Sequence, residues 1–181
     1  MSIYSQIRDG IWQATTDLYT TLAVAPVPEV IFGYGDGLEP TGSYVVISIL
    51  NIEQVGRAQQ STLTDEGTGD IKSVWTKGFY EAVVQFSFIG SEAGDLAQQF
   101  QHAVNNNRVG LIKWQENNLA PMRKTALRYN PQLRDTTWVD SFNMDVTFSY
   151  VLQTTQVMDW VEYVVIKDGI NNSIIEIPPI P

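Results

Sequence analysis

The chain has 181 residues, an apolar share of 44% and a formal net charge of −9. This length suits one ordinary domain, and the lack of cysteine excludes disulfides and thiolate chemistry. A single histidine also excludes HExxH zinc sites and most mixed His/Cys metal sites. We therefore expect a protein without a metal, a cofactor or catalytic residues.

The N-terminal sequence MSIYSQIRDGIWQ has no basic region followed by a long apolar run, which a secretory signal requires. No apolar run approaches the roughly 18 residues of a membrane span. These features predict a soluble, cytosolic product that does not act at a membrane.

Charge is unevenly distributed along the sequence. Residues 108–134 hold six basic residues and one acid, Glu116, so this segment carries +5 and the remainder carries −14. Such asymmetry favours a basic surface that meets an acidic surface on a neighbouring subunit. A nucleic-acid footprint is the alternative, although few aromatic residues are interleaved and the overall charge is negative. The candidate interface residues of this segment are Arg108, Lys113, Arg123, Lys124, Arg128 and Arg134.

Apolar residues at helical spacing predict a helix over residues 2–23. A short strand is expected at 29–34 and a longer one at 43–55, which we place centrally because both of its faces are apolar at its start. Residues 56–70 show no periodicity and predict a long loop or a projecting hairpin, which we expect to reach a lumen or a neighbouring ring.

Four glycines and a proline lie in GYGDGLEPTG, between the first two strands. A phosphate-binding loop needs a lysine and a following helix, whereas this segment has Asp36 and Glu39 and leads into a strand. We therefore interpret it as a strand-to-strand corner that needs positive φ angles.

The next segments alternate between strand and helix patterns. Residues 71–89 predict a strand, and Ser91 is expected to open a helix that ends at 105–107. Its apolar stripe consists of Ala93, Leu96, Ala97, Phe100 and Val104.

The second half of the chain reads mainly as strand. VGLIKWQ predicts a short strand or turn and MRKTALRY a strand, followed by a turn around Pro131. Residues 137–152 alternate strongly, and residues 156–165 alternate again, so QTTQ between them predicts a hairpin or a bent pair.

The sequence thus predicts an α+β fold, with a mainly antiparallel sheet and an N-terminal and a central helix packed on it. We expect one domain over residues 1–168 and an extended tail over 169–181. The tail's three prolines and its candidate contact residues Ile174, Ile175 and Ile177 suit an arm that docks on a partner, with a disordered end as the alternative.

Evidence for catalysis is weak. Asp65, Glu66 and Asp70 could serve a carboxylate-dependent hydrolase, but they lack calcium-loop spacing and are typical of a solvated or contact-forming loop. His102 has no nucleophile nearby in the sequence, and the five tryptophans are typical of core and interface anchors.

The order of segments resembles a known family. A helix precedes VIFGYGDGLEPTGSYVVISI and NIEQVGR; then come FYEAVVQFSFIG, the segment SEAGDLAQQFQHAV and a late MDVTFSYVLQTTQVMDWVEYVVI. This layout is similar to the neck and tail-terminator proteins of tailed bacteriophages, in particular the neck terminator type. Its most specific parts are Pro40-x-Gly42-x-Tyr44 and the Phe/Val strand that leads to Ser91.

The resemblance implies a structural virion protein, assembled in the host cytoplasm, in a ring of typically six subunits at the head–tail junction. Such a ring ends the tail tube, contacts tube and sheath proteins and head-completion proteins, and lets the genome pass through its lumen without specific binding. Another neck or baseplate ring subunit, such as a head-closure or tube-initiating protein, is the alternative. The family implies no catalytic residue.

Overall fold

The computed structural model describes residues 3–35, 39–64, 71–106, 108–134, 136–159, 164–167 and 174–177. The chain divides into two compact units. The first unit comprises Met1–Arg57 with Phe79–Leu152, and the second comprises Ala58–Gly78 with Gln153–Pro181. The expected boundary between residues 168 and 169 stays a prediction.

The helices and strands follow one another in this order: α1 (Ile3–Thr21), β1 (Glu29–Phe32), β2 (Tyr44–Thr64), β3 (Ile71–Ile89), α2 (Ala93–Asn106), α3 (Arg108–Glu116), β4 (Leu119–Lys124), β5 (Arg128–Tyr129), β6 (Gln132–Arg134), β7 (Thr137–Val139), β8 (Ser141–Asp159), β9 (Val164–Lys167) and β10 (Ile174–Ile177).

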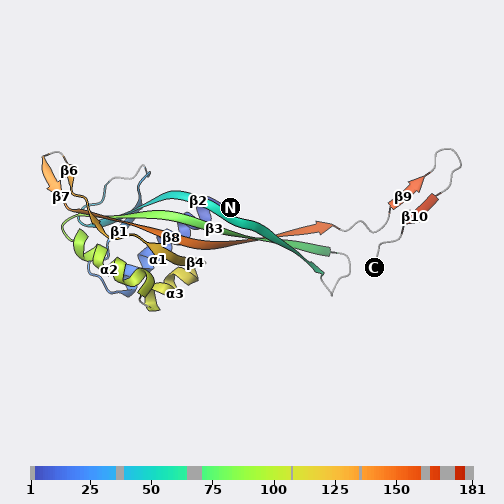
Figure 1. Ribbon diagram of the computed structural model, residues 1–181, viewed down its shortest axis with the longest axis horizontal. Helices are drawn as coiled ribbons and strands as arrows, with labels where there is room; N and C mark the ends of the chain where they lie inside the picture. Colours follow the sequence, from blue (N-terminus) through green and yellow to red (C-terminus); the bar gives the residue numbers. More distant parts are fainter. Residues whose placement is uncertain are drawn as a thin grey trace. The chain divides into compact units, whose positions relative to one another are not determined.

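The main sheet has the strand order β1-β2-β3-β8-β4, and β5 pairs with β8 beside this path. β1 runs parallel to β2, whereas β4 and β5 run antiparallel to β8. Within the first unit, α1, α2 and α3 lie on one face of the sheet (Figure 1). The predicted α+β class, with a mainly antiparallel sheet and an N-terminal and a central helix, is confirmed.

Helix α1 packs on the sheet through the predicted apolar stripe, of which Ile7, Ile11 and Leu18 are fully buried. Threonine is a weak helix former because its hydroxyl competes for backbone groups. Here the hydroxyls of Thr15, Thr16, Thr20 and Thr21 each donate to the carbonyl four residues earlier. Burial of the stripe therefore stabilises this helix more than intrinsic propensity does.

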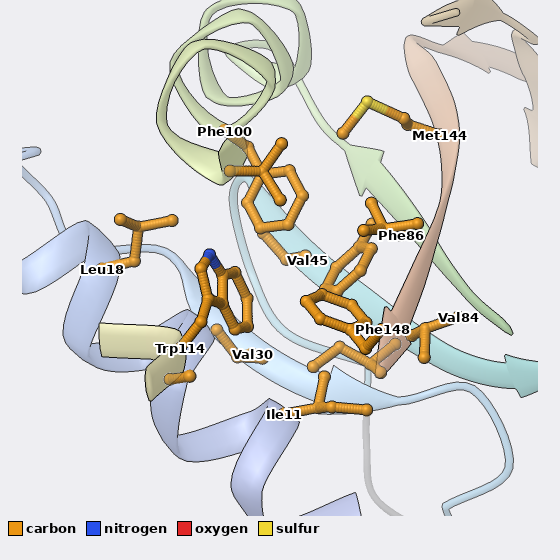
Figure 2. Close-up of a cluster of buried hydrophobic side chains, with 14 of the residues drawn as sticks. Ile11, Leu18, Val30, Val45, Val84, Phe86, Phe100, Trp114, Met144 and Phe148 are labelled. Carbon is orange, nitrogen blue, oxygen red and sulfur yellow. The ribbon is translucent and has the colours of Figure 1, made fainter. Parts of the chain in front are cut away.

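The core lies between the helices and the alternating residues of β3 and β8 (Figure 2). Phe100 of α2 contacts Phe86 of β3, with ring centroids 4.5 Å apart. Trp114 of α3 contacts Phe148 of β8 at 4.8 Å. These aromatic contacts bind two helices to two central strands, as the strand alternation predicts.

Two predictions for the second half of the chain are wrong. Residues 108–116 form helix α3 instead of a short strand or turn, because Trp114 and Gly110 are buried against the neighbouring helices and the sheet. The hairpin expected at QTTQ is also wrong, since β8 continues without a turn from Ser141 to Asp159. The alternative of a bent pair stays a prediction.

The long loop expected at 56–70 is also wrong for its first part, because β2 continues to Thr64. β3 begins at Ile71 and is hydrogen-bonded to β2, so the described strands fit the hairpin alternative. Residues 65–70 lie outside the described residues.

The glycine-rich corner joins two parallel strands, which need a long connection because the chain must return to the start of the first strand. Gly42 has φ +101°, as the predicted corner requires, and a Cβ on Gly33 would lie 2.5 Å from the Ser48 hydroxyl oxygen. Residues 36–38 lie outside the described residues.

The second unit contains the antiparallel pair β9–β10, in which Ile174 faces Lys167 across the ladder and Ile177 faces Val164. The tail is therefore partly a strand paired with its own chain. Its role as a docking arm stays a prediction.

Candidate interaction surfaces

The six basic residues of the 108–134 segment are mostly neutralised within the chain. Lys124 donates to the carbonyl of Gln101, and burial lowers the pKa of this lysine. Arg108 is exposed at the start of α3 and forms no ion pair with any described residue. The remaining four each meet an acid: Lys113 with Glu116 (2.8 Å), Arg123 with Glu81 (3.6 Å), Arg128 with Asp145 (2.6 Å) and Arg134 with Glu39.

The six basic residues are distributed over four elements, α3, β4, β5 and β6. Arg108 and Arg123 are the most available of them, since Arg123 is 76% exposed and its ion pair is long. Exposed ion pairs contribute little stability, so Arg123 can exchange its partner at small cost. Whether these residues contact a neighbour stays a proposal.

The other candidate contact residues are placed only in part. Asp65, Glu66 and Asp70 lie outside the described residues. Ile174, Ile175 and Ile177 belong to β10. The role of these residues as contacts stays a prediction.

A polar network of side chains joins strand β6 to the start of β2. The guanidinium of Arg134 pairs with Glu39 and donates to the hydroxyl of Tyr44 at 2.8 Å. The same hydroxyl donates to Glu39, and burial raises the pKa of Tyr44. Tyr44 alternates with Val45, which points into the core, so the network lies on the sheet face away from the helices.

A shallow cavity of about 390 Å³ lies beside this network. We call it the sheet-side hollow. It is lined by apolar residues from β1, β2 and β3, including Ile31, Val46 and Ile89, and by Arg134 and Glu39. Three of its polar residues, Arg134, Glu39 and Tyr44, already bind one another.

The hairpin formed by β6 and β7 carries a pair of exposed apolar side chains. Leu133 and Trp138 face each other across the ladder and are 59% and 67% exposed. Arg134, the neighbour of Leu133 along β6, points the other way into the polar network. Leu133 and Trp138 therefore point away from the body of the first unit, and we call them the hairpin knob.

A second cavity, of about 440 Å³, lies between the end of α1 and the start of α2. We call it the helix-side hollow. Leu22, Val24 and Leu96 give it apolar walls, and Glu92 and Asp95 place carboxylates in it. Neither carboxylate forms an ion pair with a described residue. The bond from the Tyr19 hydroxyl to the Leu96 carbonyl, 3.0 Å long, ties its two walls together.

The hairpin knob was missed from sequence because Trp138 shares the parity of the buried β8 residues Met144 and Val146. A break at Asp140 separates β7 from β8, so the alternation does not carry across it. The signal in the sequence was the short polar segment between two large apolar residues, Leu133 and Trp138.

The described part of the chain contains no group of three metal-ligating side chains. His102 lies exposed at the helix-side hollow. Within the described residues, no helix has the length and apolar character needed to cross a membrane.

Comparison with known families and proteins gives one assignment. Residues 5–174 match the family described as phage neck terminator protein. No curated protein matches the chain.

Proposed function

Because the chain belongs to the phage neck terminator protein family, we propose that it forms a ring at the head–tail junction, ends the tail tube there and joins the tail to the head. The chain is a structural protein of the phage neck. The match over residues 5–174 carries the proposal, since it spans nearly the whole chain.

The surfaces of the first unit support a ring. Contacts between two unlike surfaces on each copy continue from copy to copy and close when the rotation permits. The exposed knob and the two hollows provide such unlike surfaces. We propose six copies, as the resemblance implies, with tail tube and sheath proteins on one axial side and head-completion proteins on the other.

The net charge of −9 supports a lumen through which DNA passes without being held. Each lysine or arginine that contacts a phosphate strengthens DNA binding, and most basic residues of the 108–134 segment are already paired to acids. Such a surface lets the genome slide instead of gripping it.

Cryo-electron microscopy of complete and of tailless particles tests the proposal. We expect density for the chain as a closed ring between head and tail, with six copies by native mass spectrometry of isolated necks. Density for the chain at the distal end of the tail would instead assign it to the baseplate, and density only next to the portal would assign it to head closure.

A carboxylate-dependent hydrolase is not favoured, since the family is a structural one. Replacing Asp65, Glu66 and Asp70 together by alanine is expected to leave any hydrolytic activity of the purified protein unchanged. Loss of a measurable hydrolytic activity in this variant would revive that alternative.

A further inference from the structure

We infer that the hairpin knob of one copy, Leu133 and Trp138, docks into the helix-side hollow of the next copy. This inference rests on the ring proposed above and names the contact that would hold it together. It concerns only residues of the first unit.

The hairpin knob has the properties of residues that anchor a protein–protein interface. A tryptophan that is 67% exposed leaves a large apolar area in water, and the facing Leu133 enlarges it. A short two-stranded hairpin is marginally stable alone, but the bonds of Arg134 to Glu39 and Tyr44 hold this one in place. A prepositioned tryptophan loses little conformational entropy on binding, which suits it to dominate an interface.

The helix-side hollow complements the knob in size and chemistry. Its volume of about 440 Å³ is in the range of cavities, roughly 300–1,000 Å³, that enclose ligands larger than an indole ring. Leu22, Val24 and Leu96 provide apolar walls for the indole ring of Trp138. The carboxylates of Glu92 and Asp95 can accept a hydrogen bond from the indole N–H of Trp138, which has no acceptor among the described residues.

The two surfaces lie on opposite sides of the sheet. The hairpin is fixed to the face that carries Tyr44, whereas the hollow is formed by α1 and α2 on the other face (Figure 1). A copy that donates its knob to one neighbour therefore keeps its hollow free for another. This is the head-to-tail arrangement from which rings are built.

The sheet-side hollow is a weaker receptor for the knob. The carboxylate that lines it, that of Glu39, is already neutralised by Arg134 and accepts a bond from Tyr44. The two carboxylates of the helix-side hollow form no ion pair with a described residue, so they are the stronger acceptors for an indole N–H.

The first experiment compares self-association of the full chain by sedimentation. Trp138→Ala is expected to weaken association by about 30-fold or more, the loss typical of a dominant interface tryptophan. Gln99→Trp, on an exposed position of α2 that lines the hollow, is expected to fill it and weaken association as strongly. Tyr4→Ala removes a half-exposed aromatic residue elsewhere on α1 and serves as the matched control, which should associate as the natural chain does. Circular dichroism and thermal melting establish that each variant is folded.

A cross-linking experiment tests the geometry directly, because the chain has no cysteine of its own. We expect that mixing the Leu133→Cys and Gln99→Cys variants under mild oxidation yields a disulfide between two copies. Either variant alone should give no such product. The same pair is examined in particles purified from a host that supplies both variants, so that a ring formed only on the virion is also tested.

The outcomes separate this inference from the proposed function. If the chain forms rings or occupies the neck, yet Trp138→Ala associates normally and the mixed cysteines do not cross-link, the docking contact is wrong and the ring proposal stands. If Trp138→Ala leaves the ring intact but prevents attachment of the tail or head, the knob binds another neck protein and the inference fails. If no copies associate in solution or in particles, both proposals fail.

Discussion

At the scale of single residues, Tyr19 joins α1 to α2 through the bond from its hydroxyl to the Leu96 carbonyl. Tyr19→Phe removes this buried bond, so the free energy of unfolding at neutral pH is expected to fall by about 1 kcal/mol. Chemical denaturation at pH 7 measures the loss.

The same tyrosine makes stability depend on alkaline pH. Burial raises the pKa of Tyr19 well above its ordinary value of 10.0, so the folded state favours the protonated phenol. Its contribution is complete below the pKa of the unfolded chain and is lost as pH rises above it toward the folded pKa. The difference in unfolding free energy between the natural chain and Tyr19→Phe should therefore shrink above about pH 10, and a constant difference would contradict this assignment.

Gly110 permits α3 to approach α2 closely. A Cβ at this position would lie 2.1 Å from the Ala103 carbonyl oxygen, and backbone offers no easy way to move aside. Gly110→Ala is expected to destabilise the protein by about 3 kcal/mol or to displace α3, measured by urea denaturation. The control is Gly10→Ala in α1, where the added Cβ meets only ordinary contacts at 3.4 Å or more. That substitution should be neutral or stabilising by up to about 1 kcal/mol.

At the scale of elements, α1 protects the outer edge of the sheet. The indole N–H of Trp12 donates to the carbonyl of Val30 in β1, with a length of 2.8 Å. Open strand edges pair with other chains unless they are covered. This bond therefore serves both the stability of β1 and its isolation from neighbours.

Trp12→Phe keeps an aromatic ring on α1 and removes the bond to Val30. The unfolding free energy is expected to fall by about 1 kcal/mol because a partly buried carbonyl loses its donor. Trp138→Phe is the matched control, since that exposed indole has no acceptor among the described residues, and it should change stability by less than about 0.5 kcal/mol. Equal losses in the two variants would show that the Trp12 bond contributes nothing.

The elements also show why some assignments from sequence succeed. Ala82, Val84, Phe86 and Phe88 alternate within one uninterrupted strand, so their burial follows from the period of two. VGLIKWQ is too short for its period to separate helix from strand, and contact with α1 and α2 decides for helix α3.

At the scale of the whole molecule, most basic residues of the 108–134 segment are paired with acids of the same chain. We propose that Arg108 and Arg123 face acids of a neighbouring copy at the rim of the ring contact, whereas Trp138 provides most of its stability. Charges at the rim of an interface mainly accelerate association and make it depend on salt.

The double variant Arg108→Ala with Arg123→Ala is therefore expected to associate more slowly at low salt, with little change in the dissociation rate. The difference from the natural chain should vanish near 1 M NaCl, where the Debye length is about 3 Å. Stopped-flow light scattering measures both rates. Lys113→Ala, which loses an ion pair inside α3, is the control and should associate normally. A faster dissociation of the double variant would place these arginines in the buried part of the contact.

Sequence by itself determined the class of fold, the apolar stripes of α1 and α2, the alternation of β3 and β8 and the family. These properties depend on local periodicity and on the order of segments, which a single chain displays directly. The absence of cysteine excluded disulfides and thiolate chemistry, and the single histidine excluded HExxH zinc sites, both without any structure.

Only the tertiary structure decided which basic residues are paired to acids and whether Trp114 or Trp138 is exposed. Arg134 meets Tyr44 across 90 residues of sequence, and Arg128 meets Asp145 across 17, so neither pairing could be read from the 108–134 segment alone. Trp114 is buried and Trp138 exposed because a helix turns one toward the sheet and a hairpin turns the other away. Pairing and exposure depend on what lies opposite in space, and that is set by packing between distant segments.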